Sequence, residues 1–217
     1  MKKNDNISEI LKNVLPSPTI PSQLSEDEKV KIIEKHFVGI LETLGLDLSD
    51  DSLKETPKRV AKMYVKEIFS GLDREHFPKI TTIENKMSYD QMIAVQNIEV
   101  MSCCEHHLQT IQGLATVAYI PNKKVIGLSK INRIVQFFSR RPQVQERLTK
   151  QIADCLEFIL ETPHIAVQIN AKHFCVIARG IQDVNSSTIT TDVRGDFKNR
   201  PETRKEFLHS CNTHFKA

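Results

Sequence analysis

The order of its β-forming and helix-forming segments constrains the fold of this chain more than any other feature of the sequence. Two β-forming runs come first, two helix-like segments follow, and two further β-forming runs complete the pattern. The four runs are MIAVQNIEVMS (92–102), GLATVAYIPN (113–122), HIAVQINAKHFCVIARG (164–180) and SSTITTDVRGDF (186–197). Strands interrupted by a helical pair predict an α+β domain in which an antiparallel sheet is covered on one face.

The two helix-like segments, residues 128–141 and 143–161, each place apolar side chains at helical spacing on one side. We expect Pro142 to open the second helix, which would put Gln145 and Glu146 in its first turns. The apolar sides are formed by Ile131, Ile134, Val135, Phe138, Val144, Leu148, Ile152, Cys155 and Ile159.

Helical segments also precede the β-forming runs. A proline- and serine-rich linker, LPSPTIPSQ (15–23), is followed by a capping-box pattern at Ser25 and Glu28, and apolar residues then recur at helical spacing until Gly45. A second helix is predicted within residues 55–73, and its buried stripe is expected to contain Val60, Met63, Tyr64 and Ile68.

The change from helix-forming to β-forming sequence divides the chain into an N-terminal helical region, 1–90, and a second domain, 91–217. On another face of the second helix, Arg59, Lys62 and Lys66 line up at spacings of three and four residues. Helix patterning alone favours a solvated basic face for these three side chains.

Charge, hydropathy and cysteine content exclude several classes of protein. The formal net charge of +3 over 217 residues is too small for a general nucleic-acid binder. No apolar run has the length of a signal-peptide core or a membrane span, so we expect a cytoplasmic protein without a membrane partner. Five cysteines, an odd number, then favour metal binding or reactivity over a disulfide framework.

Two thiols, a carboxylate and two imidazoles occupy consecutive positions in CCEHH, residues 103–107. Zinc prefers thiolate and imidazole ligands, and a catalytic zinc keeps three protein ligands and one open position. Cys104 and His107 are three positions apart and could turn toward one ion from a tight turn. A third ligand must then come from elsewhere in the chain.

The segment HFCVIARG is the best source of that third ligand. If it is extended, alternate residues share one face, which would hold His173, Cys175, Ile177 and Arg179. The absence of CxxC, HExxH and PCxxC patterns excludes a four-cysteine site, a helical metalloprotease motif and a nucleobase deaminase. The alternative interpretation is that these cysteines are buried core thiols and that the histidines are hydrogen-bonded within the core.

Anion recognition is indicated by GLSKINRIV, which places Ser129, Lys130 and Arg133 in the first turns of a helix, where backbone amides favour anions. Gln145 and Glu146 offer hydrogen-bonding groups that could recognise the edge of a heterocycle. Polar residues on a surface helix are the competing interpretation of both groups.

Taken together, SCCEHH, GLSKINRIV, SRRPQVQERLT and HFCVIARG resemble the GTP cyclohydrolase I family, from about ETPKRVAKMY to TRKEFL. The resemblance implies a tunnelling fold, in which an antiparallel sheet with two helices on one face follows N-terminal helices. It also implies a homodecamer of two face-to-face pentamers with active sites at subunit interfaces. The implied reaction is hydrolysis of GTP at the guanine imidazole ring to 7,8-dihydroneopterin triphosphate and formate, the first step of tetrahydrofolate and pterin biosynthesis.

The resemblance assigns a role to each matching position. The zinc ligands would be Cys104, His107 and Cys175, with the fourth position left for water, the nucleophile. The acid/base groups would be His106 and His173. The substrate contacts would be Gln145 and Glu146 to guanine, Ser129 near the ribose, and Lys130, Arg133, Arg179, Lys62 and Arg59 to the triphosphate, the last two from a neighbouring subunit.

Cys103 directly precedes the motif cysteine, where the family is not expected to require a thiol, so we interpret it as a bystander. Two other functions stay open beside the enzyme: a zinc-stabilised scaffold that hydrolyses nothing, and a pterin-group enzyme with a related substrate. His106, His173 and Glu146 argue against the scaffold, and the cationic positions favour a triphosphate nucleotide.

Overall fold

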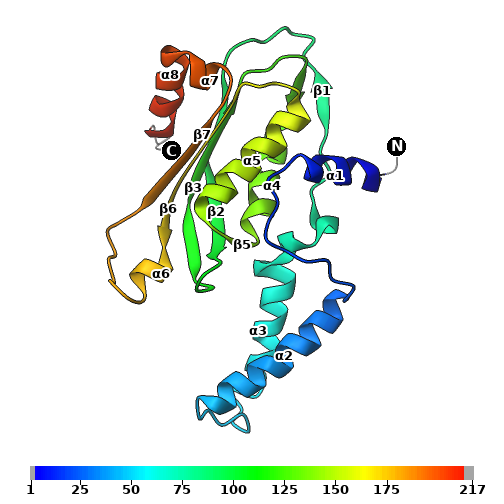
Figure 1. The fold of residues 1–217 in the computed structure, drawn as a ribbon, viewed down its shortest axis with the longest axis vertical. Coiled ribbons are helices and arrows are strands. Elements are labelled where there is room, and N and C mark those ends of the chain that lie inside the picture. The colour runs from blue at the N-terminus through cyan, green and yellow to red at the C-terminus, as the bar shows by residue number, and fades with distance from the viewer. Residues whose placement is uncertain (1–2, 213–217) are drawn as a thin grey trace.

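A five-stranded sheet forms the centre of the computed structural model, which describes residues 3–212 and, for residues 3–6, the backbone alone. The strand order is β5-β2-β3-β6-β7 (Figure 1). The strands are β2 (Ile93–Cys104), β3 (Thr110–Tyr119), β5 (Pro142–Gln143), β6 (Ile165–His173) and β7 (Thr188–Val193). All neighbours are antiparallel except β5, which pairs in parallel with the end of β2. The predicted mixed architecture is confirmed.

Helices α4 (Leu128–Ser139) and α5 (Gln145–Leu160) pack on one face of this sheet (Figure 1). Their predicted apolar residues form its core: Ile131, Ile134, Val135, Phe138, Leu148, Ile152 and Cys155 are all fully buried. The expectation that Pro142 opens the second helix was wrong. Pro142 and Gln143 pair instead with Cys103 and Cys104, and the helix begins at Gln145.

The opposite face of the sheet is covered near one end by α7 (Asp196–Asn199) and α8 (Pro201–Asn212). Successive strand residues point to opposite faces, so Val117 and Val167 join the main core while Ala118 and Ala166 join a second, smaller one. That second core is built on two phenylalanines, Phe197 and Phe207, whose rings meet edge to face.

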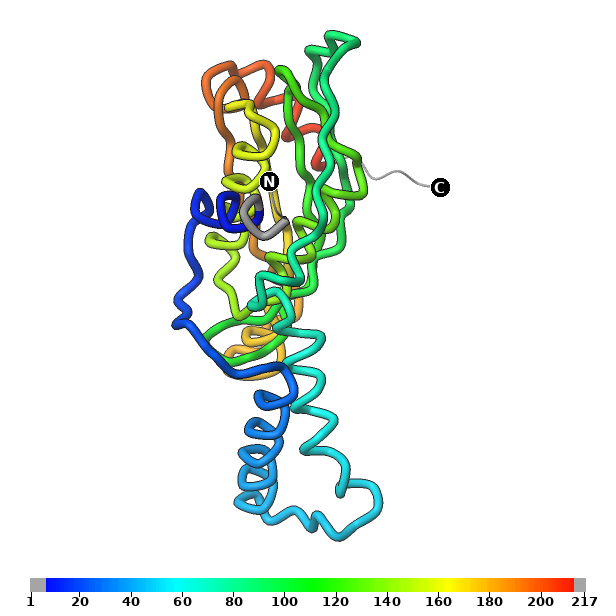
Figure 2. Tube along the Cα trace, turned by 90° about the vertical axis from the view of Figure 1, so that its right-hand side faces the viewer, coloured from blue at the N-terminus to red at the C-terminus, as the bar shows by residue number. Residues whose placement is uncertain are grey.

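A helical hairpin formed by α2 (Glu26–Thr43) and α3 (Thr56–Met63) projects from the sheet domain (Figure 2). The predicted capping box at Ser25 and Glu28 is confirmed. The second predicted helix is shorter than expected, because its turn at Tyr64–Ile68 is a π-helix. The stripe predicted as buried is only half-buried, since the hairpin stands away from the core. Apolar side chains therefore remain exposed on it, among them Ile32, Ile40, Leu44 and Leu46.

The predicted boundary near residue 90 is crossed by two contacts. Helix α1 (Lys3–Lys12) lies against α5, and Ile7, Ile10 and Val14 join the main core. Strand β1 (Thr82–Glu84) pairs with β4 (Lys124–Ile126). The division into 1–90 and 91–217 stays a prediction. Its two outer ends, residues 1–2 and 213–217, lie outside the described residues. Within the described residues, no helix has the length and apolar character needed to cross a membrane.

Candidate metal centre

The CCEHH motif spans the last two residues of β2 and the start of the loop between β2 and β3, at one end of the sheet. The amide of Cys104 donates to the carbonyl of Gln109 (2.7 Å), and the amide of Leu108 donates back to the carbonyl of Cys104 (2.8 Å). Leu108 adopts a left-handed φ of 51°, which closes the turn. The sequence predicts such a tight turn between Cys104 and His107.

Cys175 reaches the same place from β6, although not by the predicted route. The expectation of an extended segment with Cys175, Ile177 and Arg179 on one face was wrong, because the strand ends at His173 and α6 (Phe174–Ile177) follows. The register pairs His173 with Ile111 at the start of β3, so the end of β6 lies beside the loop. The first turn after the strand then brings the thiol back to the motif.

The ligand atoms of Cys104, His107 and Cys175 all lie within 4.8 Å of one another. Two sulfurs and one imidazole nitrogen are the donor types that zinc prefers. Burial, and then the neighbouring Cys104 sulfur, raise the pKa of Cys175, so a second thiolate is disfavoured here unless a cation balances it. This chemistry fits a zinc ion held by three protein ligands.

Cys103 is separate from this group. Its side chain is buried, it does not belong to the group of three donors, and its sulfur lies 3.9 Å from the carbonyl of Cys104. Burial raises the pKa of Cys103 to about 11, so it is a neutral thiol at pH 7. These properties support the prediction that Cys103 is a bystander.

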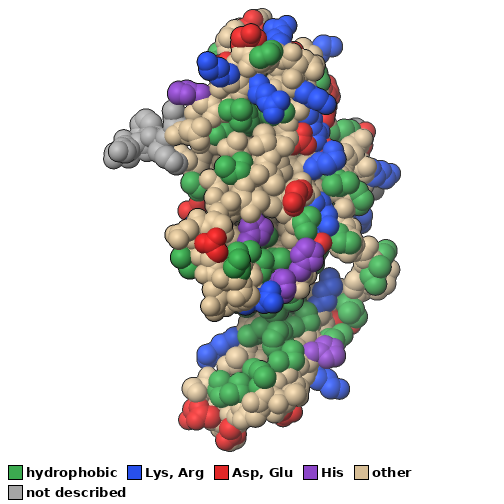
Figure 3. Space-filling model, turned by 60° about the vertical axis from the view of Figure 1, so that its left-hand side comes forward, with side chains coloured by type: hydrophobic (Ala, Val, Ile, Leu, Met, Phe, Trp, Pro, Cys, Tyr) green, Lys and Arg blue, Asp and Glu red, His purple; other side chains and the backbone are tan. Residues whose placement is uncertain are grey.

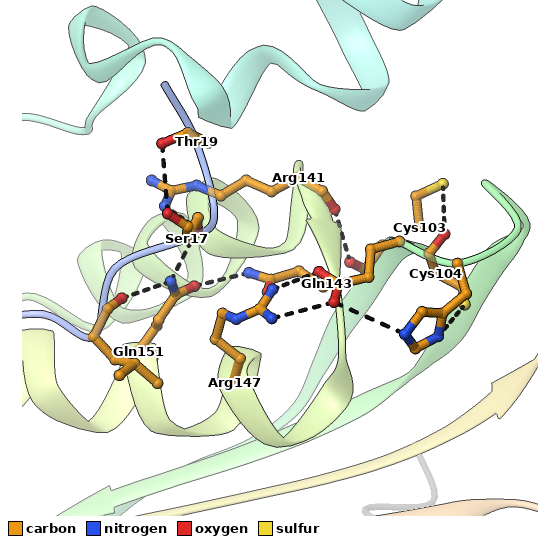
Figure 4. Close-up of polar contacts among 12 residues, drawn as sticks. Ser17, Thr19, Cys103, Cys104, Arg141, Gln143, Arg147 and Gln151 are labelled. Atoms are coloured by element: carbon orange, nitrogen blue, oxygen red, sulfur yellow. Dashed lines mark hydrogen bonds and ion pairs between the residues drawn. The ribbon is translucent and has the colours of Figure 1, made fainter. Parts of the chain in front are cut away.

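Arg147 is a residue of the site to which the sequence assigned no role. Its guanidinium donates to both carboxylate oxygens of Glu105, at 2.6 and 3.2 Å, from the first turns of α5 (Figure 4). The hydrogen bond from Arg147 lowers the pKa of Glu105, which stays ionised. The amide of Glu105 also donates to the carbonyl of Gln143. Two neighbouring elements thus fix the loop that holds Cys104 and His107, and only the position of Arg147 within QVQER hinted at this.

His173 is oriented by Gln145. The Gln145 Nε2 donates to the carbonyls of Ile169 and Thr188 at 3.0 and 2.9 Å, and since carbonyls only accept, its Oε1 must face His173. The His173 Nε2 lies 2.8 Å from that oxygen and therefore donates. Burial lowers the pKa of His173, opposed by the charge of Glu146, so the imidazole is neutral with its lone pair on Nδ1.

These contacts leave little of the Gln145 amide for a ligand. The side chain is only 1% exposed, and its Nε2 also lies 3.1 Å from the Thr190 hydroxyl. Direct contact with guanine, as predicted for Gln145, would require this amide to leave His173. Glu146, the next residue in α5, is exposed.

The remaining predicted groups divide into those beside the metal centre and those away from it. Arg179 Nη1 lies 3.0 Å from His107 Nε2, and His106 Nδ1 lies 3.8 Å from the Cys104 sulfur. Figure 3 shows histidine side chains gathered on the surface between the sheet domain and the hairpin. The C-terminal end of α4, at Ser139, lies near this site because the following strand, β5, pairs with Cys103 and Cys104. Ser129 is at the other end of the helix, about 15 Å further away along its axis.

Lys130 and Arg133 share the first turns of α4 with Ser129, and Arg59 and Lys62 are exposed on α3. Among residues 7–212, no hydrogen bond or ion pair joins any of these four side chains to the metal group. One chain therefore does not gather all the predicted substrate contacts around one centre.

Two thiols and an imidazole that could hold a metal ion lie beside further histidines, and this arrangement is typical of the class of metal-dependent enzymes. The family model for GTP cyclohydrolase I matches residues 33–212, most of the chain. The chain therefore belongs to the GTP cyclohydrolase I family.

Similar proteins agree with this assignment. A protein from Shewanella amazonensis named GTP cyclohydrolase 1 is 58% identical over 200 residues, covering 92% of this chain and 93% of the relative. Proteins of the same name from Shewanella putrefaciens and Shewanella oneidensis are also 58% identical. They cover 92% and 90% of this chain, and 94% and 90% of their own lengths.

Proposed function

We propose that this protein hydrolyses GTP at the guanine imidazole ring and produces 7,8-dihydroneopterin triphosphate and formate. The observation that supports this most is the convergence of Cys104, His107 and Cys175 from two distant segments, within 4.8 Å of one another. Family membership indicates that GTP is the substrate, and the types of donor atom favour Zn²⁺ as the metal. The reaction would be the first step of tetrahydrofolate and pterin biosynthesis.

Cys104, His107 and Cys175 would hold the zinc ion, which when bound lowers the pKa of water toward about 7 and so provides a nucleophile at neutral pH. Glu105 would keep the loop in place through Arg147. His173 is neutral and fixed, so its Nδ1 is available to take a proton from the reacting ring or ribose. His106 is exposed beside Cys104 and would protonate the purine nitrogen released as the ring opens.

The substrate contacts support an interface site. Glu146 would accept from the guanine N–H groups, Gln145 would contact guanine only if its amide left His173, and Arg179 would bind phosphate oxygens beside the metal. Ser129, Lys130 and Arg133 lie toward the far end of α4, and Arg59 and Lys62 lie on the projecting hairpin. We infer that a second and a third chain supply these groups, in a tunnelling-fold homodecamer whose assembly would also cover the exposed apolar side chains of the hairpin.

The test is to incubate zinc-loaded protein with GTP and to measure formate together with the fluorescent pterin obtained after oxidation. Equal amounts of both products are expected, and removing zinc with a chelator should abolish both. A folded, zinc-replete oligomer that releases no formate would contradict the proposal. The fixed, neutral imidazole of His173, held by the buried amide of Gln145, is not expected in a scaffold protein that catalyses nothing.

A further inference from the structure

Arg141, two residues after the end of α4, is a buried cation that has no anionic partner among the described side chains. The side chain is only 9% exposed, and its guanidinium lies over the rings of Phe137 and Phe138, 4.5 and 4.9 Å from their centroids. Its Nη1 donates to the Ser17 hydroxyl at 3.3 Å, while its Nε has no acceptor. Among the side chains of residues 7–212, no carboxylate lies within ion-pair distance of Arg141.

Such a group is costly to bury. A buried charge is normally paired, because transfer from water without compensation is strongly unfavourable. Burial lowers the pKa of Arg141 to about 10, which still leaves it protonated at neutral pH. Stacking on two aromatic rings compensates part of the cost, but the free Nε–H remains unsatisfied. The surroundings of Arg141 are therefore electrostatically complete only with an anion present.

A cavity of about 200 Å³ adjoins this guanidinium, several times the roughly 30 Å³ that one water molecule occupies. Its polar lining is contributed by Arg141, Arg74, Ser17 and Thr19, and it contains no acidic side chain. Arg74 is exposed and only loosely paired, with Glu75 at 3.9 Å. Two guanidinium groups and two hydroxyls around one small cavity are the donors that a tetrahedral oxyanion needs.

The chain segment that follows α1 forms one wall of the cavity. The Gln151 Nε2 donates to the Leu15 carbonyl at 2.8 Å and to the Ser17 hydroxyl at 3.1 Å, which holds residues 15–19 over Arg141 (Figure 4). Residues 141–143 then continue into β5, which pairs with Cys103 and Cys104. The cavity thus lies behind the metal loop, and none of the predicted substrate contacts lines it.

We propose that Arg141, Arg74, Ser17 and Thr19 form a second anion site, which binds one phosphate-sized oxyanion beneath residues 15–19. The anion pairs with the buried guanidinium and ties the N-terminal segment to the catalytic domain. This inference does not depend on the proposed reaction, because the site shares no residue with the metal centre or the predicted GTP contacts.

The probe is inorganic phosphate, added to the full-length oligomer and followed by isothermal titration calorimetry at constant ionic strength. We expect saturable binding of one phosphate per chain at this site. Arg74→Gln should weaken it by roughly tenfold to a hundredfold, because a charge-assisted donor is lost. Ser17→Ala should weaken it less. These exposed or half-exposed positions are chosen because Arg141→Gln itself could prevent folding.

Two matched controls separate this site from other arginines. Arg140→Gln removes an exposed guanidinium next in sequence to Arg141 that does not line the cavity, and it should leave phosphate affinity unchanged. Arg133→Gln removes a predicted triphosphate contact and should also leave it unchanged. Phosphate should slow hydrogen exchange in residues 14–21 severalfold in the wild type but not in Arg74→Gln.

Three results would overturn the proposal: no saturable phosphate binding, binding unaffected by Arg74→Gln, or binding lost in Arg133→Gln. The last result would assign the phosphate to the GTP site instead. Loss of formate production together with intact phosphate binding would contradict the proposed reaction and leave the anion site standing.

Discussion

The imidazole of His173 depends on a single amide, that of Gln145, whose own orientation is fixed by two backbone carbonyls. Gln145→Leu should therefore lower kcat for GTP by roughly tenfold or more, because part of the acid/base contribution of a histidine depends on its position. Zinc content should not change. Gln168→Leu, which alters a half-buried amide elsewhere on β6, is the control and should keep wild-type kcat. Equal losses in both variants would show that Gln145 has only a structural role.

The thiols of Cys175 and Cys103 should behave differently. Cys175→Ser should lose zinc, measured by atomic absorption, and activity together, because it removes one of three donors. Cys103→Ser should keep both, since its sulfur lies outside the donor group. Zinc loss in Cys103→Ser with retention in Cys175→Ser would reverse the ligand assignment.

The sequence could indicate the candidate metal donors, because thiols and imidazoles are the ligand types that zinc prefers. The partners of Gln145 could not be predicted, since they are backbone groups on β6 and β7, 24 and 43 positions away in sequence. Arg147 was missed for a related reason: an arginine on a helix pairs with Glu105 only after β5 has brought the helix to the loop.

Among the elements, α5 connects the core to the site, because it packs on the sheet and supplies Gln145, Glu146 and Arg147. Ile152→Ala should lower the free energy of unfolding by about 2–5 kcal/mol, since it leaves a cavity in a fully buried layer. Ile20→Ala, at a linker side chain that is 88% exposed, should change it little. Denaturant unfolding of both variants checks this, and similar costs would show that the core is wrongly placed.

Residue preference predicted the long strands, and hydrophobic periodicity predicted α4 and α5 because each helix buries one regular face. The short elements β5 and α6 were not predicted, because two to four residues are too few to show a periodic pattern. Their conformations depend instead on pairing with Cys103 and Cys104 and on the end of β6.

For the whole molecule, the separation of Arg133 from Cys175 predicts active sites shared between chains. Arg133→Gln and Cys175→Ser should each be nearly inactive alone. Dissociated and reassembled together, they should recover up to about a quarter of wild-type activity, because random mixing gives some sites two intact contributors. If reassembled mixtures stay inactive while wild-type protein treated in the same way recovers, each site lies within one chain.

Sequence patterns predict the contacts between subunits less well than they predict helices and strands. Helix periodicity marked an apolar stripe on α2, but the structure leaves Ile40 and Leu44 exposed there, 49% and 70% respectively. A stripe that faces another subunit and a stripe that faces the chain's own core have the same spacing, so the sequence alone could not distinguish them.

The most direct measurement uses GTP labelled with carbon-13 at position eight of guanine, followed by NMR during turnover by the zinc-loaded oligomer. We predict that the label leaves the purine signal and appears entirely as formate, at the rate at which the pterin forms. Label that stays in the nucleotide, or that appears in any product other than formate, would contradict the proposed hydrolysis of the imidazole ring.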